Sequence, residues 1–92
     1  MVEDTNFKKD DNKIYLEDTE GRIIAEVEFE ETEKGTFNIY HTFVDESLRG
    51  QGIASKLIQK AVSEIKARNG KVTTSCSYAK KWLEKNKIYW QN

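Results

Sequence analysis

The stretch Tyr40–Ala54, YHTFVDESLRGQGIA, decides the fold. Its first five residues are typical of a β-strand, and its last six form a glycine-rich turn that opens a helix. The backbone N–H groups of such a turn lack partners within the helix and lie at the positive end of the helix dipole. Because glycine has no Cβ, the backbone at Gly50 and Gly52 can approach a ligand closely. The stretch therefore predicts a site for a phosphate group.

The residues after this turn predict a helix, a strand and a second helix. Residues 68–70 end the first helix, with Gly70 as the C′ residue. Lys71 to Cys76 is rich in β-formers, and a strand after a crossover helix should lie parallel to the strand before it. A second helix is expected from about Tyr78 to Lys85, and residues 88–90 then cover the sheet edge or add a short strand. Apolar residues with a period of 3.6 define the first helix: Ile53, Leu57, Ile58, Ala61, Val62 and Ile65.

Three strands joined by short turns precede the glycine turn, which predicts an antiparallel meander. The strands are expected at residues 14–17, 23–30 and 37–44, with turns at 18–21 and 31–35. In the second strand, one face is apolar and the other is acidic, because Ile23, Ala25, Val27 and Phe29 alternate with Glu26, Glu28 and Glu30. In the third strand, alternation places Phe37, Ile39, His41 and Phe43 on one face and Thr42 and Val44 on the other. The whole chain, residues 1–92, is expected to form one domain with a flexible terminus at residues 1–12.

The stretch also carries a family resemblance. Arg49-x-x-Gly52-x-Ala54 resembles the Arg/Gln-x-x-Gly-x-Gly/Ala signature of the GNAT N-acetyltransferase superfamily. The order of meander, glycine turn, helix, strand and helix resembles the core of that fold over about residues 13–90. The resemblance implies a compact α+β fold whose parallel strands, before and after the helix, splay apart. Only a tight turn at 18–21 stands where the family has acceptor-site helices, so the chain looks like the minimal single-domain GNAT-like proteins.

In that superfamily the turn holds the pyrophosphate of acetyl-CoA, and the pantetheine arm enters the gap between the splayed strands. By resemblance, Phe43 and Val44 offer backbone groups to the arm, and Phe43 also packs in the core. The coenzyme cradle would comprise Arg49, Gly50, Gln51, Gly52, Ile53 and Ala54. Acetyl-CoA is the expected cosubstrate.

Three side chains are candidates for the chemistry. Cys76 ends the second strand of the gap, where a thiolate could take the acetyl group, or where the side chain could simply line the pocket. His41 could deprotonate Cys76 or an amine, provided that the two side chains face the same way, or it could pack in the core. Tyr78 could protonate the departing CoA thiolate, or begin the second helix as a packing residue. Glu26 and Glu28 are further candidates for a base.

Charge and composition narrow the functional classes. Residues 1–46 carry fourteen Asp/Glu and five Lys/Arg, whereas residues 47–92 carry two and ten. A basic second half suits a ligand with several phosphates, and an acidic first half suits a cationic amine. One cysteine and one histidine provide no zinc motif, so no metal is expected. The sequence shows no signal peptide, membrane span or lipidation signal, so we expect a cytoplasmic protein without a membrane partner.

The sequence therefore predicts an acetyl-CoA-dependent N-acetyltransferase that acts on a primary amine. The amine, on a small molecule or a protein, attacks the thioester directly or receives acetyl from Cys76. The alternative is a non-catalytic module that binds acetyl-CoA or CoA as a sensor. A nucleic-acid-binding role is disfavoured, because the basic residues lie on helix faces without a recognition motif.

Overall fold

The computed structural model describes residues 6–86. It confirms the predicted α+β class and the predicted order of elements, and adds a strand at the beginning. The elements are β1 (Lys8–Asp10), β2 (Lys13–Glu17), β3 (Ile23–Glu33), β4 (Thr36–Val44), the 3₁₀ turn η2 (Glu46–Leu48), α1 (Ile53–Ala67), β5 (Lys71–Thr74) and α2 (Ser77–Lys85). Residues 88–90, for which a sheet-covering role was predicted, lie outside the described part of the chain.

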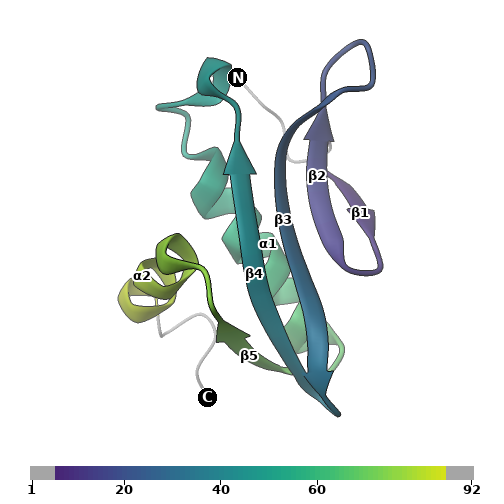
Figure 1. The fold of residues 1–92 in the computed structure, drawn as a ribbon, viewed down its shortest axis with the longest axis vertical. Coiled ribbons are helices and arrows are strands. Elements are labelled where there is room, and N and C mark those ends of the chain that lie inside the picture. Colours follow the sequence, from purple (N-terminus) through teal and green to yellow (C-terminus); the bar gives the residue numbers. More distant parts are fainter. Residues whose placement is uncertain (1–5, 87–92) are drawn as a thin grey trace.

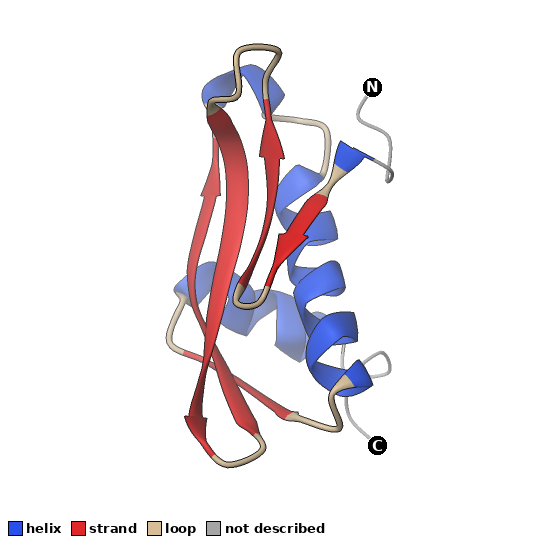
Figure 2. Cartoon of the chain, turned by 90° about the vertical axis from the view of Figure 1, so that its right-hand side faces the viewer, coloured by secondary structure: helices blue, strands red, loops and turns tan. Residues whose placement is uncertain are grey.

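One five-stranded sheet organises the molecule, with the strands in the order β1-β2-β3-β4-β5. β1 to β4 are antiparallel neighbours, and β5 pairs with β4 in the parallel sense, as predicted for a strand after a crossover helix. Helix α1 lies along one face of the sheet, and α2 packs at the end of β5 (Figures 1 and 2). No helix among the described residues is long and apolar enough to span a membrane.

The core lies between α1 and the sheet. All six apolar residues of the predicted α1 stripe are buried. They meet the apolar face of β3 and residues from the neighbouring elements in one cluster: Ile14, Leu16, Ala25, Val27, Phe29, Phe37, Ile39, Ala79, Trp82 and Leu83. The apolar alternation in β3 and the helical period in α1 were thus sufficient to predict which faces meet.

A β-bulge interrupts β4 at Tyr40. Phe29 of β3 pairs with Ile39, but the preceding residue, Glu28, pairs with His41. β4 therefore has one residue more than β3 at this point, and Tyr40 is that extra residue. The Tyr40 side chain is exposed, and its hydroxyl donates to Glu28 Oε2 at 3.2 Å. Partial burial and the neighbouring Glu28 carboxylate raise the pKa of Tyr40, so the phenol keeps its proton.

The bulge reverses the faces of the strand beyond it. Thr42 and Val44 lie opposite buried residues of β3, whereas His41 and Phe43 lie opposite its glutamates. The prediction that His41 and Phe43 share the face of Ile39 is therefore wrong. Phe43 is 39% exposed and is not a core residue. A strict period of two does not anticipate an inserted residue.

The N-terminal prediction also needs correction. β1 lies within residues 1–12, which were expected to be flexible, and pairs with β2. Lys9 Nζ of β1 lies 3.0 Å from Glu64 Oε1 of α1, so an ion pair adds to the strand hydrogen bonds. The sequence does not predict this strand, because its side chains are polar and exposed and only its backbone joins the sheet.

Helix α1 ends in a Schellman motif. Gly70 N donates to Ile65 O at 2.9 Å, and Asn69 N donates to Lys66 O at 2.9 Å. The residue with the left-handed conformation is Asn69, with φ of 60°, and not Gly70 as predicted. Asparagine tolerates this conformation better than most residues. Gly70 instead allows close packing, because a Cβ there would lie 2.6 Å from Phe37 Cδ1 and 2.8 Å from Ile65 Cγ2.

We expect Gly70→Ala to destabilise the fold by about 1–3 kcal/mol, since the added methyl overpacks a core contact. Urea unfolding monitored by circular dichroism measures this change. Combining the substitution with Phe37→Leu should recover part of the loss, because the smaller side chain gives way to the methyl. Equal stability of Gly70→Ala and the wild type would contradict the packing argument.

Candidate functional site

The glycine turn joins the end of η2 to the start of α1. Asp45 caps η2: its carboxylate accepts from the Ser47 hydroxyl at 2.6 Å and from Ser47 N at 3.0 Å. The hydroxyl bond, more than the backbone bond, holds the pKa of Asp45 below its ordinary value. The cap fixes the direction in which the chain leaves β4 and enters the turn.

The turn adopts a conformation that favours glycine. Gly50 has φ of 84°, and Gly52, the N-cap of α1, has φ of 70°. Gly52 has no side chain with which to cap the helix, so the first N–H groups of α1 have no partner in the helix or in its cap. A fifteen-residue helix presents its positive dipole end at the same place. These are the features that the predicted anion site requires.

β4 and β5 separate next to this turn. Their pairing ends where Ile39 lies beside Thr74, whereas β4 continues to Val44. Beyond this point no strand of residues 6–86 pairs with the outer side of β4. We call Tyr40–Val44 the open edge. The splay that the sequence resemblance implied is therefore present (Figure 1).

The register shows which backbone groups face the open edge. Asp45 N donates to Ile24 O of β3 at 2.8 Å, so the odd-numbered residues beyond the bulge direct N–H and C=O towards β3. Thr42 and Val44 direct theirs outward. The backbone of Val44 therefore faces the gap, whereas the backbone of Phe43 faces β3 and is not available to a ligand in the gap. Sequence reasoning missed Thr42, because only the bulge assigns it to this side.

A hollow of about 240 Å³ connects the end of the open edge with the turn. Tyr78 of α2 joins its wall, so a residue proposed for chemistry borders the predicted coenzyme cradle. Gln51, the remaining residue of the predicted cradle, does not line the hollow. The lining residues are Val44, Leu48, Arg49, Gly50, Gly52, Ile53, Ala54 and Tyr78.

Cys76 lies at the opening between the splayed strands. It is the N-cap of α2, it is half-buried, and its Sγ lies 3.7 Å from the Thr42 hydroxyl of β4. Thr74 fixes the adjoining backbone, since its hydroxyl donates to Ile39 O at 2.6 Å and accepts from Cys76 N at 3.0 Å. The thiol is thereby held beside the open edge.

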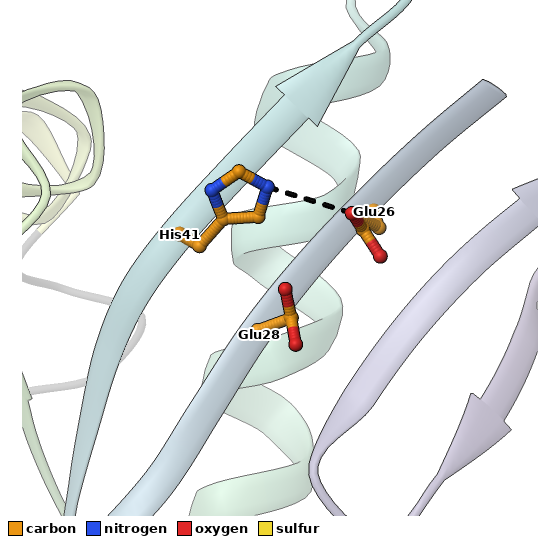
Figure 3. Close-up of side chains that lie close together, drawn as sticks. All are labelled: Glu26, Glu28 and His41. Carbon is orange, nitrogen blue, oxygen red and sulfur yellow. Dashed lines mark ion pairs between the residues drawn. The ribbon is translucent and has the colours of Figure 1, made fainter. Parts of the chain in front are cut away.

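His41 projects from the other face of the sheet. Its Nε2 lies 3.5 Å from Glu26 Oε2 of β3, and its side chain is 44% exposed (Figure 3). Cys76 instead contacts the neighbouring Thr42, whose side chain points to the opposite face. No hydrogen bond joins His41 to Cys76 among the contacts of residues 6–86, so the structure does not form this predicted pair. The structure instead pairs His41 with Glu26, one of the two predicted acidic candidates.

Comparison with known proteins places this arrangement in a family. A sequence model described as GCN5-related N-acetyl-transferase matches residues 13–92. The chain belongs to this family. The match spans the open edge, the glycine turn and α2, and it confirms the resemblance that the turn suggested.

Solved structures of GCN5-related proteins share the fold. A GCN5-like protein from Staphylococcus aureus is 37% identical with a TM-score of 0.75, over 90% of this chain and 81% of that one. YhbS from Escherichia coli, solved in complex with CoA, is 25% identical with a TM-score of 0.59, over 67% and 38% of the two chains. A GNAT acetyltransferase from Staphylococcus aureus Mu50 is 16% identical with a TM-score of 0.65, over 80% and 50%. No match was found among curated proteins.

The chain thus covers 81% of the first of these structures, but only 38% of YhbS and 50% of the Mu50 acetyltransferase. This GCN5-related chain also joins β2 to β3 by a short turn, in which Asp18 O accepts from Gly21 N at 3.0 Å. The tight turn that the sequence predicted at residues 18–21 is therefore present.

Proposed function

We propose that this protein is an N-acetyltransferase that transfers acetyl from acetyl-CoA to a primary amine. One observation carries the proposal: the open edge of β4 leads directly to the unpaired amides of the glycine turn. An extended pantetheine arm and a pyrophosphate need these two kinds of group in this order. Family membership and the CoA complex of YhbS support the same assignment.

The pyrophosphate would lie at the N-terminus of α1. The N–H groups from Gly50 to Ala54 donate to its oxygens, and the helix dipole favours its charge. Arg49, one of the residues that line the hollow, adds a positive charge. The pantetheine amides then pair with the outward backbone groups of Thr42 and Val44, as an added strand would.

Acetyl transfer exchanges a C–S bond for a C–N bond. The nitrogen of a neutral amine attacks the thioester carbonyl, and N–H groups of the open edge stabilise the negative charge that develops on the oxygen. The C–S bond breaks, and Tyr78 donates a proton to the CoA thiolate. His41, oriented by Glu26, accepts the proton that the amine releases.

Two routes for the acetyl group remain in this proposal, and the contacts of Cys76 favour direct attack. A nucleophilic thiol needs a base within hydrogen-bond reach. Among the described residues, the one hydrogen-bond partner of the Cys76 sulfur is the Thr42 hydroxyl, and no imidazole or carboxylate contacts it. The route through acetylated Cys76 would require a rearrangement that brings a base to the sulfur.

Titration of ¹⁵N-labelled protein with acetyl-CoA, and separately with CoA, tests the coenzyme site by NMR. We expect amide shifts at Thr42, Val44 and residues 49–54 with both ligands, and additional shifts at Cys76 and Tyr78 that depend on the acetyl group. The absence of shifts at millimolar ligand would refute the assignment.

An amine screen with detection of free CoA tests turnover. Acceptors should include small amines and lysine-containing peptides, since the acidic outer face of β3 suits either class. Binding of acetyl-CoA without release of CoA in the presence of any amine would instead indicate the non-catalytic sensor module. The short turn between β2 and β3 favours this alternative, because it stands where the family has acceptor-site helices.

A further inference from the structure

Three potential ligand atoms converge on the outer face of the sheet. They belong to Glu26 and Glu28 of β3 and to His41 of β4, and they all lie within 4.8 Å of one another. Figure 3 shows the imidazole facing the two carboxylates across the strand pair. The bulge at Tyr40 creates this cluster, because it turns His41 towards the acidic face.

The spacing suits a small transition-metal ion. Two ligands bound tetrahedrally to zinc at 2.0–2.2 Å lie about 3.4 Å apart. His41 Nε2 and Glu26 Oε2 are 3.5 Å apart, and Glu28 lies directly opposite His41 in the register. Only side-chain rotation is needed to bring the third ligand closer, because the backbone already places all three residues on one face.

The surroundings favour a cation and leave it accessible. Two carboxylates side by side repel each other, and a bound cation relieves that repulsion. The Tyr40 hydroxyl holds Glu28 Oε2 at 3.2 Å, as outer partners of metal ligands commonly do. Lys13 is the cationic residue opposite Glu28 on β2. Its ammonium lies over the Tyr15 ring, 5.0 Å from the ring centroid.

We propose that Glu26, Glu28 and His41 form a three-ligand site for Zn²⁺ or a similar imidazole-binding divalent ion. The sequence predicted no metal, because it has a single histidine and no cysteine motif. The two carboxylates reach the imidazole only through the pairing of β3 with β4, which the sequence does not show. Water would complete the coordination on the solvent side. The ion would take the place of the contact between His41 Nε2 and Glu26 that orients the imidazole in the proposed transfer, so zinc would inhibit that reaction.

Titration of the Cys76→Ser protein with zinc chloride tests the site, because this background removes the only thiol. NMR of the imidazole gives an unambiguous readout, since His41 is the only histidine. We expect the Nε2 resonance to shift with saturation at one ion per chain. Calorimetry should show that Glu26→Gln and Glu28→Gln each weaken binding at least tenfold, since loss of an outer partner alone commonly costs about 10- to 100-fold.

Glu30→Gln is the matched control. It removes the same charge from the same face of β3, but Glu30 pairs with Asn38, beyond the bulge from His41. Its zinc affinity should stay within about twofold of the parent, since it loses no ligand. An unmoved imidazole at millimolar zinc, or equal weakening by Glu26→Gln and Glu30→Gln, would overturn the site. Amide spectra of each variant establish that the fold is intact.

Discussion

Gly52→Ala is expected to weaken acetyl-CoA binding by about 10- to 100-fold. The residue has φ of 70° at the N-cap of α1, where an alanine is strained by about 1–2 kcal/mol. Relief of that strain rotates the amides that the pyrophosphate requires. Loss of one charge-assisted hydrogen bond costs about 1.5–3 kcal/mol, which corresponds to that range of dissociation constants. Isothermal titration calorimetry with acetyl-CoA measures the change.

Gly21→Ala provides a matched control for the strain. Gly21 has φ of 83° in the turn between β2 and β3, and a Cβ at either glycine meets nothing within 4 Å. The two variants should therefore lose similar free energy of unfolding, but Gly21→Ala should keep wild-type affinity for acetyl-CoA. Equal loss of affinity in both would mean that Gly52 acts only through stability.

His41→Gln is expected to lower kcat for acetyl transfer by about 10²- to 10⁴-fold, because glutamine cannot accept the proton of the amine. The proposal places His41 in proton transfer and not in coenzyme binding, so the dissociation constant of acetyl-CoA should change little. Steady-state kinetics on an acceptor found by the amine screen, with calorimetry on the same variant, separates the two quantities.

Cys76→Ala is the comparison that separates the two routes. Direct attack predicts that this variant retains activity within about tenfold of the wild type, since its thiol makes no bond to the acetyl group. A loss of several orders of magnitude, with acetylated enzyme detected by mass spectrometry in the wild type and not in the variant, would instead establish the covalent route. Wild-type kcat in His41→Gln would exclude the imidazole as the proton acceptor.

Much of the fold was predictable because its strongest signals are periodic. The α1 stripe predicts the six buried helix residues, and the alternation of Ala25, Val27 and Phe29 predicts the buried face of β3. The glycine turn was predictable for a different reason, since positive φ at Gly50 and Gly52 restricts the residue type. Each of these signals lies in consecutive residues, so no knowledge of tertiary contacts was needed.

The missed features depend on pairings between distant residues. Nothing near Tyr40 indicates a bulge, because the extra residue exists only relative to β3. Without the bulge, His41 was assigned to the core face and could not be paired with Glu26. β1 was missed for a related reason: its three exposed residues carry no apolar pattern, and its partner strand and helix α1 hold it in place.

The open edge of β4 also bears on aggregation. An unpaired strand edge is a template on which a second chain can add by backbone hydrogen bonding. Thr42 and Val44 present such groups without a neighbouring strand among the described residues. A bound pantetheine arm would cover them as a temporary sixth strand. The coenzyme would therefore act as a solubilising partner for the fold, and depletion of the coenzyme would expose a surface prone to self-association.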